Sequence, residues 1–144
     1  MYIRMYIALM VCFCSGIAAY DIKTYRIPDI LLLLFASFII ILEGKQPFFI
    51  AIERIVTAFI IFLLFAAIWH YSRGLGFGDV KYAALLGYIM GADGIISTLL
   101  YAAFLSIFIY LIGFLAFHLP KTTKIPFAPF LSAGAILSLV EGIL

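Results

Sequence analysis

Two aspartates in this apolar chain have neighbours suited to acid–base chemistry. Asp21 opens the stretch "DIKTYRIPD", and Asp79 follows three glycines in "GLGFGDVK". A carboxylate near hydrocarbon is costly unless it meets water, a partner or a reaction, and glycines let another backbone come close. Two neighbouring carboxyl groups that share one proton can act as base and acid together. The pattern therefore allows an aspartic dyad. By spacing alone, a simpler interpretation is favoured, in which Asp21 and Asp29 are interfacial helix-end residues and Asp79 caps a helix.

The composition indicates a membrane protein. Of the 144 residues, 67% are hydrophobic and 11% are charged, whereas a soluble domain is about half apolar and roughly a quarter charged. Too little polar surface remains to cover a globule in water. We therefore expect one membrane-embedded domain, residues 1–144, without a separate soluble domain. The net charge of +2 is small and no basic stripe is present, so nucleic acid is not expected as a partner.

Apolar runs between short polar breaks predict an all-α fold, a polytopic bundle of about six transmembrane helices. The second, fourth and sixth are shorter than the roughly 20 residues of a full span. Either these helices extend into the neighbouring loops, or they stop early because a water-filled site thins the membrane there. The expected ranges are Tyr2–Tyr20, Pro28–Leu42, Phe49–Tyr71, Val80–Met90, Gly94–Phe117 and Phe130–Leu144.

The basic residues predict the orientation of these helices. Positive charge is enriched in cytoplasmic loops, and one set of loops carries more of it than the other. The richer set holds Lys23, Arg26, Arg73, Lys81, Lys121 and Lys124, against Arg4, Lys45 and Arg54. Asp21 ends the first helix and Asp79 begins the fourth, with two helices between them. Both carboxylates are therefore expected at the same face of the membrane, the cytoplasmic one.

Three ordered motifs give the chain a family resemblance. "DIKTYRIPD", "GLGFGDVK" with its GxGD core, and "KIPFAPFLSAG" resemble the type IV prepilin peptidases, membrane aspartic peptidases that trim leader peptides from pilins. The resemblance implies that Asp21 and Asp79 are the catalytic pair and that Gly76 and Gly78 let the substrate backbone pack beside Asp79. It also implies a prepilin or pseudopilin substrate, no cofactor, and a multi-pass protein of the inner membrane whose site faces the cytoplasm.

Other motif residues are expected to shape the site. Pro28 and Asp29 would fix how the second helix leaves the membrane surface, and asparagine is more frequent in the family where this chain has Asp29. Lys81 would either help to keep the acids ionised or reach lipid phosphates. In "IPFAPF", Pro126 and Phe127 would form a rigid turn with an apolar wall beside the site, although a purely structural turn is also plausible.

The stretch between the first two helices is short. Large members of the family carry two CxxC pairs suited to zinc there, whereas this chain has only "DIKTYRIP". It therefore resembles the short form found with Flp/Tad-type pili, and N-methylation of the new pilin N-terminus is not expected. Cys12 and Cys14 form a CxC pair without a second pair, so we interpret them as two small buried side chains and expect no metal site.

Other functions remain open. Tyr20-Asp21 and the GFGD stretch also resemble presenilin-like peptidases, which have more helices and a PAL motif that this sequence lacks. Archaeal preflagellin peptidases are a closer variant that differs in substrate. A non-enzymatic membrane subunit, in which the aspartates pair with Lys81 or Arg26 for assembly, is a third possibility. The oligomeric state is not predicted.

Overall fold

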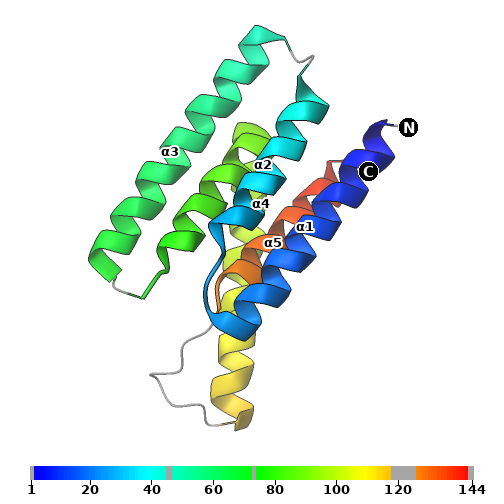
Figure 1. Ribbon diagram of the computed structural model, residues 1–144. Coiled ribbons are helices and arrows are strands. Elements are labelled where there is room, and N and C mark those ends of the chain that lie inside the picture. The colour runs from blue at the N-terminus through cyan, green and yellow to red at the C-terminus, as the bar shows by residue number, and fades with distance from the viewer. Residues whose placement is uncertain (1, 45–46, 73, 118–125, 143–144) are drawn as a thin grey trace.

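A computed structural model of the chain describes residues 2–44, 47–72, 74–117 and 126–142 (Figure 1). All regular structure in these ranges is helical, as the sequence predicts. Four basic residues used for the orientation, Lys45, Arg73, Lys121 and Lys124, lie outside them. The helices are α1 (Tyr2–Thr24), α2 (Asp29–Glu43), α3 (Phe48–Ser72), α4 (Phe77–Phe117) and α5 (Ala128–Glu141).

The fourth and fifth expected helices are the two halves of α4 and meet at a kink. Between these two expected helices, in "GADG", the chain bends at Gly91, whose φ of 68° and ψ of −175° are not helical. A positive φ of this kind favours glycine. Glu53 of α3 stabilises the bend, because its Oε1 accepts a hydrogen bond of 2.9 Å from the Ala92 N–H group. The bundle therefore has the six expected helical segments, carried on five helices.

The lengths and surfaces of the helices fit a bilayer. Three helices, α1, α3 and α4, are long and apolar enough to cross a membrane. Helices α2 and α5 have 15 and 14 residues, or roughly 21–23 Å at 1.5 Å per residue, less than the roughly 30 Å of a hydrocarbon core. Large apolar side chains such as Ile41, Phe104 and Phe48 are exposed, as expected for a surface in contact with lipid.

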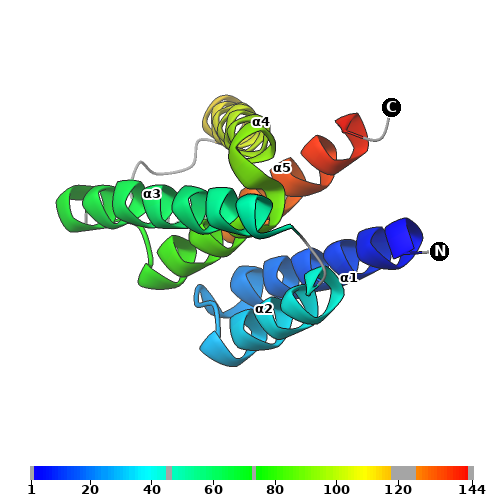
Figure 2. The same cartoon turned by 90° about the horizontal axis from the view of Figure 1, so that it is seen from above.

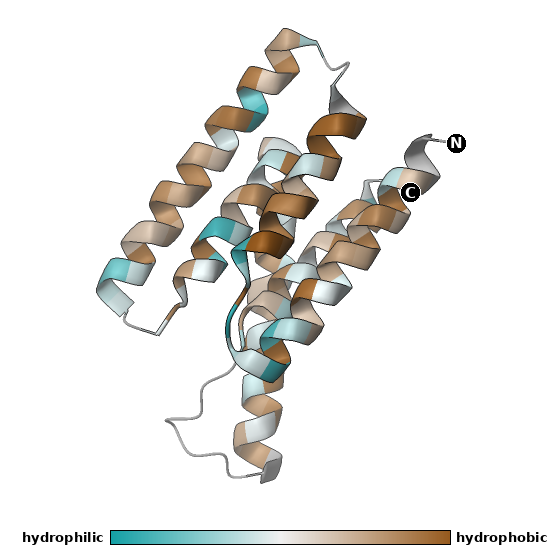
Figure 3. Ribbon diagram, in the orientation of Figure 1, coloured by the Kyte–Doolittle hydropathy of each residue, from teal (hydrophilic) through white to brown (hydrophobic). Residues whose placement is uncertain are grey.

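The bundle is assembled around α4 and α5. Helix α4 makes its most extensive contacts with α5 and α3, and α1 packs on α5. Figure 2 shows α1 and α2 side by side, and Figure 1 shows α3 at the opposite edge of the bundle from α1. The start of α1 and the end of α5 lie at one end in both views, and Figure 1 shows α1 ending and α4 beginning at the opposite end. Hydrophilic residues gather where α1 ends and where α2 and α4 begin (Figure 3).

Candidate active site

Asp21 lies in the last turn of α1, at a well-defined helix end. Tyr25 has a left-handed backbone (φ 52°), and its N–H group donates a hydrogen bond of 2.8 Å to the carbonyl oxygen of Asp21, which closes the final turn. The Asp21 side chain is buried, with 4% of its surface exposed. Its Oδ2 accepts a hydrogen bond of 3.3 Å from the N–H group of Ala128, the first residue of α5.

Asp79 is the third residue of α4 and closes the start of that helix. Its N–H group donates to the Gly76 carbonyl oxygen at 3.1 Å, and its Oδ2 accepts from the Gly76 N–H group at 3.2 Å, the reach of a capping box. Asp79 is therefore not the cap residue of the simpler interpretation; it is the third helical residue, and its side chain reaches back to the Gly76 N–H group. Asp79 Oδ1 is buried and accepts no hydrogen bond from any residue that the structure describes.

The two carboxyl groups share one electrostatic environment. Each accepts a hydrogen bond from a backbone N–H group at a helix start, Asp79 at α4 and Asp21 at α5, where the helix dipole favours negative charge. Both side chains are also buried, which disfavours their charged forms. The two helix starts and the burial therefore act in opposite directions on each carboxyl group.

The two glycines of the GxGD motif have different neighbours. A Cβ atom on Gly76 would lie 3.3 Å from Asp79 Oδ2, whereas one on Gly78 would lie 3.1 Å from the Cβ atom of Ile27. Gly76 thus leaves room beside the carboxyl group. Gly78 lets α4 pack closely on Ile27, the residue before Pro28. Among the described residues, Gly78 therefore faces the Ile27-Pro28-Asp29 stretch rather than a carboxyl group.

Asp29 and Lys81 form an ion pair near the start of α4. Both carboxylate oxygens of Asp29 lie 2.8 Å from Lys81 Nζ. Pro28 is the N-cap residue of α2 and makes no side-chain capping hydrogen bond. Asp29 is the first helical residue. The pair ties the start of α2 to α4, two residues after Asp79. The carboxylate that Lys81 contacts in the described part of the chain is therefore Asp29, rather than Asp21 or Asp79.

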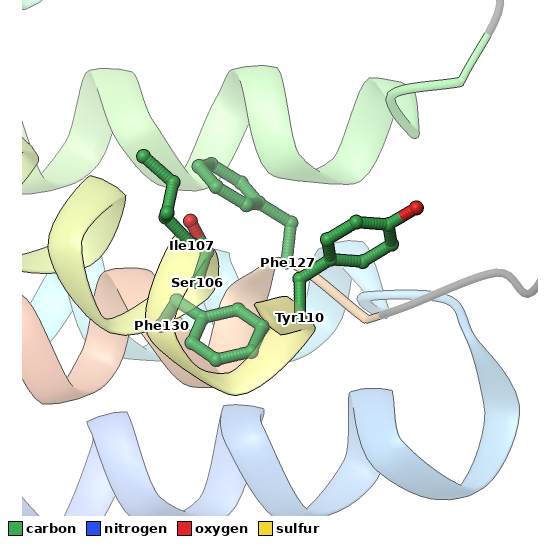
Figure 4. A pocket seen from close by; sticks show the side chains of 5 residues that line it. All are labelled: Ser106, Ile107, Tyr110, Phe127 and Phe130. Atoms are coloured by element: carbon green, nitrogen blue, oxygen red, sulfur yellow. The ribbon is translucent and has the colours of Figure 1, made fainter. Parts of the chain in front are cut away.

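Pro126 and Phe127 lie just before α5, which begins at Ala128. The ring of Phe127 is 6.3 Å from that of Phe65 in α3. Phe127 also lines a cavity of about 300 Å³ between the second half of α4 and the start of α5 (Figure 4). The other lining residues are Ser106, Ile107, Tyr110 and Phe130.

Two features of the site were missed by the sequence analysis. One is the Ala128 amide that binds Asp21. The other is a buried polar cluster, in which the Tyr82 hydroxyl lies 2.8 Å from Ser132 Oγ and 3.4 Å from Cys14 Sγ. Tyr82 follows Asp79 by three residues, and a buried tyrosine hydroxyl needs a partner, but the sequence gives no sign of which partner.

The cysteines behave differently from each other. Cys14 is buried, as expected, but Cys12 is exposed, so the interpretation of two buried side chains is wrong for Cys12. The reason is helical geometry, because residues two apart face different sides of a helix. Among the described residues, no group of three or more His, Cys, Asp or Glu side chains gathers as a metal-binding cluster.

The fold and the site together define an all-helical membrane protein with two buried carboxyl groups at helix starts. Residues 8–112 match the profile of the type IV leader peptidase family, and the chain belongs to that family. It is also similar to a prepilin leader peptidase/N-methyltransferase of Bacillus subtilis (strain 168), with 26% identity over 129 residues, 88% of this chain and 51% of the relative. The chain thus spans about half the length of that relative. No solved structure matches it.

Proposed function

We propose that this protein is an aspartic endopeptidase that removes the leader peptide of type IV prepilin-like precursors, of the Flp type, at the cytoplasmic face of the membrane. The observation that carries the proposal is the pair of buried carboxyl groups, Asp21 and Asp79, each held by one backbone N–H group at a helix start. Membership of the type IV leader peptidase family supports the same reaction.

In the proposed reaction the two carboxyl groups hold one proton between them. The ionised group takes a proton from a water molecule, whose oxygen attacks the scissile carbonyl carbon, while the protonated group donates its proton to the carbonyl oxygen. The tetrahedral intermediate then breaks its C–N bond. The first group returns its proton to the leaving nitrogen, and the second takes one from a hydroxyl as the carbonyl re-forms. Asp79 Oδ1, buried and without a protein partner among the described residues, is the oxygen best suited to bind the water or the carbonyl.

The proposed substrate meets the dyad at the cytoplasmic face. There a precursor can present its leader before its apolar helix leaves the membrane. The leader is proposed to be short and basic and to end in glycine or another small residue. We propose the peptidase reaction alone. The N-methyltransferase in the relative's name is not carried over, because the stretch between α1 and α2 holds no CxxC pair.

The proposed activity is tested by co-expression with an Flp-type prepilin carrying a C-terminal tag. The expected result is a tagged product that is smaller by the length of the leader and has the mature N-terminus by sequencing. A second precursor, in which a bulky residue replaces the last leader residue, should remain uncut. If the protein accumulates in the membrane and the first precursor stays full length, the proposed function is wrong.

A further inference from the structure

The buried cluster of Tyr82, Ser132 and Cys14 joins three helices in the interior of the bundle. Tyr82 belongs to α4, Ser132 to α5 and Cys14 to α1. The Tyr82 hydroxyl lies 2.8 Å from Ser132 Oγ and donates to Cys14 Sγ at 3.4 Å. Tyr82 and Cys14 are 0% exposed, and Ser132 is 3% exposed. Because a tyrosine hydroxyl has one proton, Ser132 donates to the Tyr82 oxygen when Tyr82 donates to Cys14.

The cluster lies on the same helix faces as the candidate site. Each of its members is one or two turns from a site residue, at spacings of three, four and seven residues: Tyr82 from Asp79, Ser132 from Ala128 and Cys14 from Asp21. Each of these spacings returns to nearly the same face of an α-helix. At 1.5 Å per residue, Tyr82 is about 4.5 Å beyond Asp79 along α4, and Ser132 is about 6 Å beyond Ala128 along α5. The cluster is therefore the next layer of side chains, deeper in the bundle than the carboxyl groups.

The two carboxyl groups come from helices that do not pack directly on each other. Asp21 is in α1 and Asp79 is in α4, and in the described part of the chain the backbones of these helices make no close approach, whereas both helices pack on α5. The position of one carboxyl group relative to the other therefore depends on how α1 and α4 are each held against α5. The Tyr82 hydroxyl acts on this arrangement, because it bonds to α5 through Ser132 and to α1 through Cys14.

We propose that the Tyr82 hydroxyl is a positioning group, which sets the relative placement of Asp21 and Asp79 by holding α4 against α5 and α1. The inference rests on the proposed peptidase function and adds a positioning residue to it. Tyr82 is 0% exposed, so a precursor does not reach it. Its effect is therefore on the rate of the chemical step rather than on the binding of the precursor.

The test is steady-state cleavage of a synthetic Flp-type precursor by the purified full-length protein in detergent micelles. The kcat value is expressed per folded protein and measured well below the melting temperature of every variant. Tyr82→Phe keeps the ring and removes the hydroxyl. It should lower kcat about tenfold or more, because a misplacement of about 1 Å can cost roughly 100-fold. KM should stay within about twofold of the wild-type value, as expected when only the transition state is affected.

Tyr101→Phe is the matched control. The Tyr101 hydroxyl also joins α4 to α5, because it donates to Glu141 Oε2 at 3.0 Å. This contact is at the far end of α5, away from the two carboxyl groups. Tyr101→Phe should therefore keep the wild-type kcat and KM.

A second variant separates positioning from stability. Ser132→Ala breaks the same hydrogen bond but leaves Tyr82 with Cys14 as a partner, so it carries the test even if Tyr82→Phe does not accumulate. It should also lower kcat without changing KM. In the double variant neither hydroxyl is left unpaired, so its melting temperature should be higher than that of Tyr82→Phe. Its kcat should nevertheless stay as low as in the slower single variant, because both changes remove one shared contact.

The possible failures are distinguishable. A wild-type kcat in Tyr82→Phe and Ser132→Ala would overturn the inference, and so would a kcat that recovers with the melting temperature in the double variant. A raised KM at unchanged kcat would also overturn it, because the hydroxyl would then act on precursor binding. An equal loss of kcat in Tyr101→Phe would show that any loosening of α5 has the same effect. In all these cases the proposed peptidase function stands. If the wild type cuts no precursor, both the proposed function and the inference fail.

Discussion

Replacement of Gly134 by alanine tests how α5 is held in place. A Cβ atom at this buried position would overlap the Thr98 carbonyl oxygen and lie 3.0 Å from the Ala102 amide nitrogen. Both are backbone atoms of α4, so the added methyl group can be accommodated only if the helices move apart. Overpacking of this kind destabilises by about 1–3 kcal/mol.

The matched control is Gly16→Ala in α1, where an added Cβ atom has no neighbour within 4 Å. There alanine should stabilise the helix by about 0.5–1 kcal/mol. The two variants should therefore differ by about 1.5–4 kcal/mol in the free energy of unfolding. At about 4 °C per kcal/mol for a chain of this size, this corresponds to roughly 6–16 °C in melting temperature.

The assay is thermal melting of both variants in the same detergent, followed by cleavage of a precursor. Displacement of α5 also moves Ala128, whose hydrogen bond to Asp21 is already 3.3 Å long. Gly134→Ala should therefore lose cleavage, whereas Gly16→Ala should retain it. Equal melting temperatures and equal cleavage would refute the close packing of α5 on α4 as the constraint that positions Asp21.

Tyr82→Phe should destabilise the protein by about 1–3 kcal/mol, because it leaves the buried Ser132 hydroxyl without its 2.8 Å partner; adding Ser132→Ala should recover part of this loss in melting experiments, and strict additivity would contradict the contact. Asp29→Asn should keep cleavage within about threefold, because the Asp29 side chain is 64% exposed and an exposed pair with Lys81 contributes only about 0–1 kcal/mol. A cysteine at exposed Thr24, in a variant whose exposed Cys12 is replaced by alanine, should react only with reagent on the cytoplasmic side; labelling from outside in intact cells would reverse the orientation.

The sequence was sufficient for the helical elements, because apolar runs between polar breaks identify all of them, including the short α2 and α5. The even number of helices between Asp21 and Asp79 predicts one common face for these two residues. The boundary at Gly91 was harder. "GADG" has the composition of a turn, but the helical conformation is interrupted at Gly91 alone, and Glu53 from another helix caps Ala92 directly after it.

The partners of the carboxyl groups could not be predicted from the sequence. The Ala128 amide lies 107 residues from Asp21 along the chain, and a backbone N–H group leaves no mark on residue type. The pairing of Lys81 with Asp29, 52 residues apart, likewise depends on how closely α2 approaches α4. Gly78 permits that approach by its contact with Ile27, a role that the motif alone does not distinguish from contact with substrate.

The most direct test of the account is cleavage of an Flp-type precursor by Asp21→Asn and Asp79→Asn. Asparagine keeps the shape of aspartate but cannot exchange the catalytic proton, so each variant should accumulate in the membrane and cut no precursor. The double variant should be no worse than either single one, because the residues act as a unit. Asp93→Asn, at an exposed aspartate beyond the Gly91 bend, is the control and should cut normally. Cleavage by either Asp21→Asn or Asp79→Asn at the rate of that control would contradict the dyad.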